Sequence, residues 1–232
     1  MTLLIKEILK LKPKNQLVTA EGWVKNFRAN KFISLNDGST IQNIQCVIDF
    51  ENFDYSIIKK INTGASLLIK GKLVKSVGSG QEIEVLVVDI KIYGESHPEK
   101  YPIQPKKHSF EFLRENAHLR IRTTTFGAIM RIRSKLSYAT HKFFQNENFQ
   151  YVNTPIITSN DAEGAGEMFR VTTLDPNSPP LEKNNVDFTK DFFSKKTHLT
   201  VSGQLEAESY ALGLGKVYTF GPTFRAENSN TT

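Results

Sequence analysis

The sequence predicts a small all-β barrel followed by part of an α+β domain, and three observations carry this prediction. Residues 17–93 contain five runs with strand character, with a short helical run between the third and the fourth. Residues 94–108 collect Gly, Pro and Lys, which is linker composition. After this linker the apolar residues take up a helical period, and strands then follow without strict strand–helix alternation.

The first half is predicted element by element from its apolar patterns and turn residues. An amphipathic segment at the N-terminus is followed by three strands, a helix and two strands, namely Leu17–Phe27, Phe32–Asn36, Ile41–Phe50, Asp54–Ile61, Ala65–Val77 and Ile83–Tyr93. Asp37-Gly38-Ser39 is a hairpin signal between the second and third strands. This is the element order of an OB-fold, a barrel that binds oligonucleotides. A generic barrel without a ligand remains the alternative.

The second half opens with a long helix. Its apolar stripe includes Phe126, Ile129, Leu136 and Phe143, which indicates about twenty helical residues. The elements expected after it are a strand at Tyr151–Ile157, a polar loop over residues 174–191, a short strand at Leu199–Ser202, a helix at Gln204–Leu212 and a strand at Lys216–Phe224. We therefore expect an α+β domain with an antiparallel sheet.

Composition limits the class of protein. The 39% hydrophobic content and 16 Phe residues can form real cores. The single cysteine, Cys46, cannot form an internal disulfide, which fits a reducing compartment, and we expect it to be a small apolar residue inside a strand. The start has no signal-peptide pattern, and no stretch approaches the ~18 apolar residues of a membrane span. We expect a soluble, cytoplasmic protein.

Positive charge is concentrated in the first half. Residues 1–107 hold 16 Lys and Arg against 11 Asp and Glu, whereas residues 108–232 hold 14 against 13. A basic bias of this size suits a polyanionic partner, although a solvated lysine-rich surface gives the same count.

Two groups of residues could carry function. Trp23, Phe27, Arg28, Phe32 and Gln45 fall on the first three predicted strands, where OB-folds stack bases on aromatics, although strand aromatics more often belong to the core. Near the C-terminus Arg225 and Glu227 are two residues apart on an extended segment, so both side chains should point the same way. An arginine suits phosphate and a carboxylate can accept from an amino group, but a solvated surface pair is the usual interpretation.

Other catalytic signatures are missing from the sequence. There is no glycine-rich phosphate loop of the Walker type, no zinc-ligand spacing and no Ser-His-Asp pattern, and the five histidines are scattered. We therefore predict no metal site within these residues. Asp161–Phe169 has the composition of a mobile loop with carboxylates, and Ser202 could simply cap the helix that begins at Gln204.

Four segments, in order, resemble class II aminoacyl-tRNA synthetases. Residues 148–157 resemble the first signature motif, with Asn148 where a glycine is usual. Residues 161–169 resemble the loop that closes over the amino acid, and Val201–Leu205 resembles a strand–helix junction of the amino-acid pocket. Gly221–Asn230 resembles the second motif, and its Phe-Arg-Ala-Glu-Asn-Ser-Asn-Thr run resembles the asparaginyl branch. The barrel pattern resembles the anticodon-binding domain of the aspartyl and asparaginyl enzymes.

The resemblance implies roles for individual residues. Phe32 would stack on the central anticodon uridine, Gln45 would hydrogen-bond that base, and Arg28 would contact the anticodon. In the amino-acid pocket, Glu163 would meet the substrate ammonium group and Gln204 would contact the amino acid. In the ATP site, Arg225 would hold the α-phosphate as the catalytic cation, and Glu227 would meet the adenine amino group.

The implied activity is ATP-dependent activation of asparagine and its transfer to tRNA(Asn) by a homodimeric ligase. Aspartyl enzymes carry a lysine where Ala207 stands, so Ala207 favours asparagine. We expect an anticodon-binding domain over residues 1–100, a linker over 101–118 and an incomplete catalytic domain over 119–232, which ends inside the second motif and should be inactive alone. ATP and Mg²⁺ are implied, with the Mg²⁺ ligands beyond residue 232.

Two alternatives stay open. One is an aspartyl-tRNA synthetase, including a non-discriminating one. The other is a non-catalytic nucleic-acid-binding module of the OB type.

Overall fold

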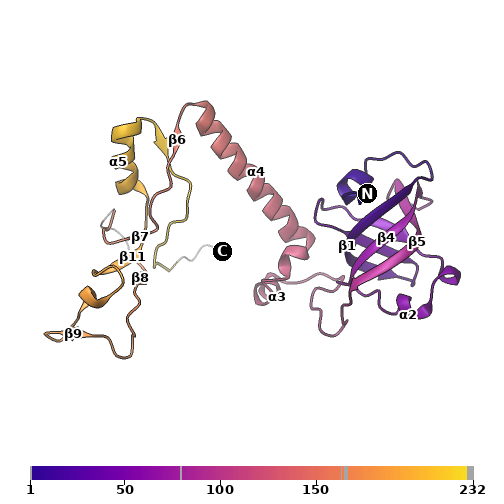
Figure 1. Cartoon of the computed structure of the whole chain (residues 1–232), viewed down its shortest axis with the longest axis horizontal. Helices are drawn as coiled ribbons and strands as arrows, with labels where there is room; N and C mark the ends of the chain where they lie inside the picture. The colour runs from indigo at the N-terminus through magenta and orange to yellow at the C-terminus, as the bar shows by residue number, and fades with distance from the viewer. Residues whose placement is uncertain (1, 79, 163, 165–166, 229–232) are drawn as a thin grey trace. The chain divides into compact units, whose positions relative to one another are not determined.

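The computed structural model describes residues 2–78, 80–162, 164 and 167–228, and its contacts divide the chain into two units, residues 1–134 and 135–232. Helix α4 (Thr124–Asn146) belongs to both units, because the division falls within it (Figure 1). None of the helices described is long and apolar enough to cross a membrane.

The first unit is built around a closed five-stranded barrel. Its elements are α1 (Ile5–Ile8), β1 (Leu17–Arg28), β2 (Phe32–Asn36), β3 (Ile44–Val47), the 3₁₀ turn η1 (Phe50–Asn52), α2 (Tyr55–Ile58), β4 (Ser66–Lys75) and β5 (Ile83–Gly94). The strand order is β1-β2-β3-β5-β4, and β1 closes the barrel because it pairs with both β2 and β4. All pairs are antiparallel except β3–β5, which is parallel. The predicted OB-fold is confirmed.

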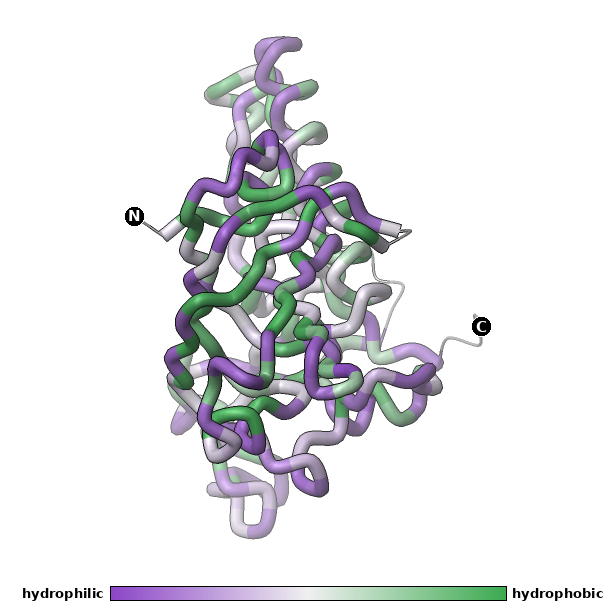
Figure 2. Tube along the Cα trace, turned by 90° about the vertical axis from the view of Figure 1, so that its right-hand side faces the viewer, coloured by the Kyte–Doolittle hydropathy of each residue, from purple (hydrophilic) through white to green (hydrophobic). Residues whose placement is uncertain are grey.

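Strand alternation fills the barrel with small and branched apolar side chains. On β2, Ile33 and Leu35 are fully buried, whereas Phe32 and Ser34 between them are only half-buried. A bulge on β1 between Val24 and Asn26 adds one residue and turns Phe27 toward the core. Figure 2 shows the resulting apolar segments running through the barrel strands. The outer face of β1, β2 and β3 is thereby left with a separate set of side chains.

The segment after the barrel is ordered against it and includes structure that the sequence did not predict. Helix α3 (Phe110–Glu115) begins where the Ser109 hydroxyl accepts from the Phe112 N–H at 3.2 Å, and the 3₁₀ turn η2 (Arg120–Arg122) leads into α4. Ile103, in the predicted linker, is buried.

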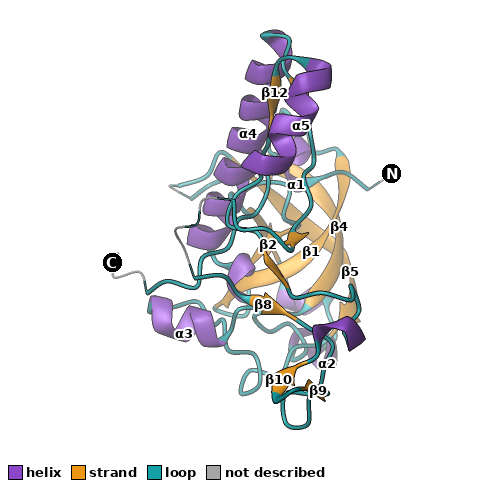
Figure 3. Ribbon diagram, turned by 90° about the vertical axis from the view of Figure 1, so that its left-hand side faces the viewer, coloured by secondary structure: helices purple, strands orange, loops and turns teal. Residues whose placement is uncertain are grey.

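Beyond the end of α4, the second unit contains short strands and helix α5 (Figure 3). Its elements are β6 (Gln150–Tyr151), β7 (Ile157–Thr158), β8 (Arg170–Val171), β9 (Leu181–Glu182), β10 (Asn185–Val186), the 3₁₀ turn η3 (Phe188–Lys190), β11 (Thr197–Leu199), α5 (Gln204–Leu214) and β12 (Val217–Tyr218). The sheet β7-β11-β8 is antiparallel, as is the β9–β10 hairpin, whereas β6 and β12 pair in parallel.

Several predicted strands are shorter in the structure. The strand predicted over Tyr151–Ile157 is interrupted at Pro155, which has no N–H to donate, and becomes β6 and β7. The strand predicted over Lys216–Phe224 is confined to β12, because beyond it the backbone bonds pass from β6 to other segments. The predicted loop over residues 174–191 contains the β9–β10 hairpin.

Candidate functional site

The outer face of β1, β2 and β3 brings together the three barrel residues singled out in the sequence. Cross-strand register places Arg28 opposite Phe32 and Phe32 opposite Val47, and the next row holds Asn26, Ser34 and Gln45. The core residues Ile33 and Cys46 lie between these rows and point inward. Arg28, Phe32 and Gln45 therefore share one outward surface, which we call the platform face.

Phe32 is the aromatic of this face that a planar ligand can reach. Its ring is half-buried, and the Lys31 ammonium lies 5.8 Å from the ring centroid. The other two predicted aromatics are occupied: Phe27 packs against the barrel core, and the Arg122 guanidinium covers Trp23 at 5.2 Å from its ring. A half-buried aromatic flanked by cations suits a nucleobase and its phosphates.

Gln45 is held in one orientation by a residue that the sequence analysis missed. Its side-chain amide N–H donates to Glu84 Oε2 at 3.0 Å, and the Ser76 hydroxyl donates to the same oxygen at 3.0 Å. Glu84 is only 7% exposed. Because this bond fixes the direction in which the amide faces, the Gln45 carbonyl oxygen can accept from a ligand, and the second amide N–H can still donate. Glu84 follows the apolar Ile83, so alternation alone could have marked it as outward but not as a partner of Gln45.

Cys46 has no place in this face. It is fully buried, and burial in the core raises the pKa of its thiol far above the ordinary range. The expectation of a small apolar residue inside a strand is confirmed.

Backbone hydrogen bonds bring the second set of predicted residues into one region of the second unit. Phe224 donates to the Thr200 carbonyl at 2.9 Å, and Ala226 donates to the Glu167 carbonyl at 2.7 Å. The Thr200 N–H in turn donates to the Ile156 carbonyl at 2.8 Å. The segment that carries Arg225 and Glu227 is thus joined to the loop predicted to close over the amino acid.

Arg225 and Glu227 are both exposed in this extended segment. Since Phe224 and Ala226 make the backbone bonds, the alternating residues Arg225 and Glu227 project from a common side. A guanidinium beside a carboxylate can hold a phosphate and accept from an amino group.

Gln204 begins helix α5, four residues after Thr200. Its backbone N–H donates to the Ser202 hydroxyl at 3.1 Å, so Ser202 satisfies one of the free donors at this helix start. Its side-chain amide is exposed and donates to Glu208 Oε1 at 3.0 Å. Gly203 leaves no room for a side chain, because a Cβ there would lie 2.5 Å from Thr154 Oγ1. Glu163 lies outside the described residues.

Asp191 joins the segment after β8 to the segment after η3 in the second unit. The residue is 6% exposed. Its carboxylate accepts from the hydroxyls of Thr172 and Thr173 at 2.6 and 2.9 Å and from the backbone N–H groups of Thr173 and Phe192 at 2.9 and 2.8 Å. These bonds, led by the one from Thr172, hold the pKa of Asp191 well below its usual range.

Family models match both units. Residues 18–93 match the OB-fold nucleic acid binding domain, and residues 109–232 match the class II tRNA synthetases of the D, K and N group. Because the second match covers more than half of the residues, the chain belongs to the class II tRNA synthetases of this group.

Within this family, the similar proteins include asparagine–tRNA ligases. The chain is 54% identical to the asparagine–tRNA ligase of Borreliella afzelii over 233 residues, which cover 98% of the chain and 50% of that protein. It is 55% identical to the corresponding ligase of Cytophaga hutchinsonii with the same coverage. Among solved structures, the asparaginyl-tRNA synthetase of Pyrococcus horikoshii complexed with asparaginyl-adenylate superimposes with a TM-score of 0.79 at 25% identity, over 100% of the chain and 50% of that structure. The chain thus spans about half the length of these relatives.

Proposed function

We propose that this protein acts as an asparagine–tRNA ligase, which activates asparagine with ATP and transfers it to tRNA(Asn). The observation that carries the proposal is the 54–55% identity to asparagine–tRNA ligases across 98% of the chain, through both units. Ala207, which is uncharged, supports asparagine over aspartate, because a second substrate carboxylate would find no cation at this position.

In this proposal the platform face binds the anticodon. Phe32 stacks on the central uridine, Gln45 accepts from that base through its free carbonyl oxygen, and Arg28 contacts the anticodon backbone from the neighbouring strand position. The partial exposure of Phe32 and the fixed orientation of Gln45 support these roles.

Binding of an RNA stem-loop with the tRNA(Asn) anticodon tests this part. Phe32→Ala should weaken binding by about 1–3 kcal/mol, the range for one base–aromatic stack, without unfolding the barrel. Ile33→Ala is the control, since Ile33 is fully buried and its loss should lower stability by about 2–5 kcal/mol instead. If Phe32→Ala unfolds the barrel, and binding is lost only because the protein is unfolded, Phe32 is a core residue and its role as a base platform is wrong.

The second unit is proposed to carry the activation step. A carboxylate oxygen of asparagine attacks the α-phosphorus of ATP, the bond to the bridging oxygen breaks, and pyrophosphate leaves with that electron pair. Arg225 neutralises the charge that builds on the α-phosphate oxygens, Glu227 accepts from the adenine amino group, and Glu163 and Gln204 hold the amino acid.

Pyrophosphate exchange by the complete protein tests this part. Arg225→Ala should lower kcat by about 10²–10³ with a smaller effect on KM for asparagine, because its contact strengthens in the transition state. Exchange should strongly favour asparagine over aspartate. Equal rates with the two amino acids would support a non-discriminating aspartyl enzyme instead.

ATP and Mg²⁺ are the cofactors that membership of this family implies. The described residues fit the nucleotide, since Arg225 and Glu227 supply groups for its phosphate and its base. They do not fit the metal, because no group of three His, Cys, Asp or Glu among them is placed to hold an ion. We therefore assign no step of this chain's residues to Mg²⁺.

The partner protein is proposed to be a second copy, bound along helix α4. Ile129, Ile132, Leu136, Ala139 and Phe143 follow the alternating three- and four-residue spacing of a helix–helix seam, and all five are exposed. Light scattering on the complete protein should show a dimer, and Leu136→Glu should convert it to a monomer. The matched change Lys135→Glu, off the seam, should leave the dimer intact, and a monomeric wild type would overturn the proposal.

A further inference from the structure

A second feature of the barrel unit has no role in the assignments above. A pocket of about 540 Å³ lies between β1, β2, the segment after the barrel and the start of α4. Lys25 lies inside it, and Lys106 and Lys107 come from the segment that the sequence predicted to be a linker. We call it the basic pocket.

The charge of the basic pocket is unopposed. None of the described residues that line it is acidic, and three are lysines. Thr123 and Thr124 at the start of α4 complete its rim, where the helix dipole adds a positive end. A site of one sign with low-dielectric walls attracts the opposite charge.

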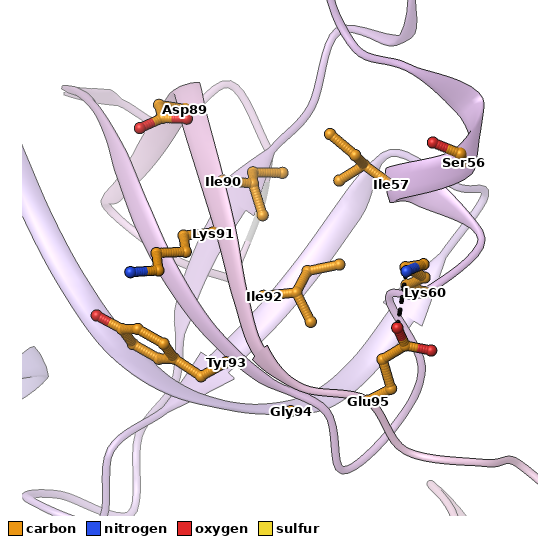
Figure 4. A pocket seen from close by; sticks show the side chains of 10 residues that line it. All are labelled: Ser56, Ile57, Lys60, Asp89, Ile90, Lys91, Ile92, Tyr93, Gly94 and Glu95. Carbon is orange, nitrogen blue, oxygen red and sulfur yellow. Dashed lines mark ion pairs between the residues drawn. The ribbon is translucent and has the colours of Figure 1, made fainter.

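A larger pocket in the same unit shows the contrast. Its volume is about 780 Å³, and it contains Lys60 and Lys91 but also Asp89 and Glu95. Figure 4 shows Lys60 paired with Glu95, at 2.8 Å, while Ile90 and Ile92 point toward Ile57. Its charges cancel, so this pocket gives no reason to expect an anion.

Lys25 is the most enclosed cation of the basic pocket. Its ammonium donates to the backbone carbonyl of Arg122. Burial, followed by repulsion from the Arg122 guanidinium, lowers the pKa of Lys25. A partly desolvated ammonium with no carboxylate among the described lining residues is a group that a bound anion would stabilise.

The basic pocket is continuous with the platform face. Asn26 and Ser34 line the pocket, and cross-strand register places Ser34 directly opposite Gln45. Ser34 follows Phe32 by two residues on β2, a distance of about 7 Å along the strand. OB-folds bind about 4–16 nucleotides, so a strand held at Phe32 must continue past the platform.

We propose that the basic pocket binds backbone phosphates of the RNA strand that continues from the base stacked on Phe32, with Lys25, Lys106 and Lys107 as the phosphate ligands. This inference deepens the proposed function and rests on it. The shared chemistry is phosphate, which an RNA backbone or a free phosphate ion could supply.

The salt dependence of RNA binding tests the proposal. The triple variant Lys25→Gln, Lys106→Gln, Lys107→Gln of this 232-residue chain is compared with wild type for binding of the anticodon stem-loop. Each lost phosphate contact to a single strand should reduce the slope of log Kobs against log salt by about 0.7, so the triple variant should lose about 2. Glutamine keeps a donor for the Arg122 carbonyl, which protects the fold.

A matched triple variant controls for total charge. It also removes three positive charges, but from lysines that do not line the basic pocket, through Lys60→Gln, Lys70→Gln and Lys91→Gln. This variant should keep the slope of log Kobs against log salt to within about 0.7 of the wild-type slope. Equal slope losses in both variants would overturn the proposal, since only the net field would matter. An unchanged slope in the pocket variant, with Phe32→Ala still weakening binding, would also overturn it while leaving the proposed function intact.

Two further measurements distinguish RNA phosphates from free phosphate as the ligand and test whether the chain binds the stem-loop at all. Inorganic phosphate is titrated while amide shifts of Asn26 and Ser34 are followed by NMR. Saturation by free phosphate together with an unchanged RNA slope would show a small-anion site and overturn the proposal. Absence of stem-loop binding by wild type, Phe32→Ala and both triple variants alike would instead reject the proposed function and, with it, this inference.

Discussion

The buried carboxylate of Glu84 determines which end of the Gln45 amide faces a ligand. Its Oε2 accepts from both Gln45 and Ser76, so the Gln45 amide cannot rotate without losing a bond. Glu84→Gln replaces part of this acceptor with a donor. We expect the variant to weaken stem-loop binding by about 1–2 kcal/mol, comparable to one lost hydrogen bond.

A double-mutant cycle checks that Glu84 acts through Gln45. In a Gln45→Ala background the Glu84→Gln change should have little further effect on binding. Additive losses would mean that Glu84 contacts the RNA by itself. Circular dichroism should show the same barrel in all four proteins.

The hydrogen bonds of Asp191 should make the stability of the second unit sensitive to acid. Its pKa is lowered in the folded protein, so the stability it contributes is present above the unfolded pKa of about 3.9 and is lost as the pH falls below that value. Asp191→Asn should lower the unfolding temperature at pH 7 and make it depend less on pH between about 5 and 3. Identical pH profiles for variant and wild type would contradict this origin.

Strand alternation makes some of these residues predictable and others not. Arg28 and Phe32 fall on one face because a tight hairpin sets their register, and this could be inferred locally. Glu84 meets Gln45 through the parallel pairing of β3 with β5, which no local pattern reveals. The meeting of Lys25 on β1 with Lys107 in the predicted linker is equally hidden, because linker composition does not reveal that the segment lies against the barrel.

At the scale of elements, the end of helix α4 is determined by one residue. Asn148 has a φ of 62°, Phe149 donates to the Phe144 carbonyl at 2.9 Å, and Asn148 donates to Gln145 at 3.1 Å. These are the two bonds of a Schellman cap, and the Phe144 and Phe149 rings, 5.4 Å apart, supply its apolar contact. Asn148, which stands where the first signature motif usually has a glycine, thus adopts the left-handed conformation that a glycine would adopt.

This cap predicts opposite effects for two small substitutions. Asn148→Ala should destabilise the protein by about 1 kcal/mol, because alanine disfavours positive φ. Asn148→Gly should be neutral or stabilising by a few tenths of a kcal/mol, since glycine adopts this conformation freely. Urea unfolding of the two variants measures the difference, and equal midpoints would argue against the cap as the cause.

One strand is shorter than predicted because its continuation pairs with distant segments, and one hairpin was not predicted. Apolar residues continue past Tyr218, but the strand ends there because Phe224 and Ala226 bond to Thr200 and Glu167 instead of β6. The β9–β10 hairpin was missed because its turn uses Lys183 and Asn184 at positive φ, without the usual glycine signal.

At the scale of the whole molecule, the two units predict two unfolding transitions. Trp23 is the single tryptophan and lies on β1, so its fluorescence reports the barrel unit, whereas circular dichroism reports both. We expect the two signals to give different midpoints in urea. Ile33→Ala should shift the fluorescence transition, and Asp191→Asn should shift only the other. Coincident curves in every variant would show one cooperative unit.

The late closure of the barrel has a consequence during translation. Gln45 and Glu84 are separated by 39 residues, and the parallel contact between their strands cannot form before β5 has left the ribosome. At about 5–20 residues per second this interval lasts about 2–8 s. Throughout this interval the Gln45 side chain of the nascent chain lacks the partner that fixes its orientation, so the platform face is complete only once β5 has been synthesised.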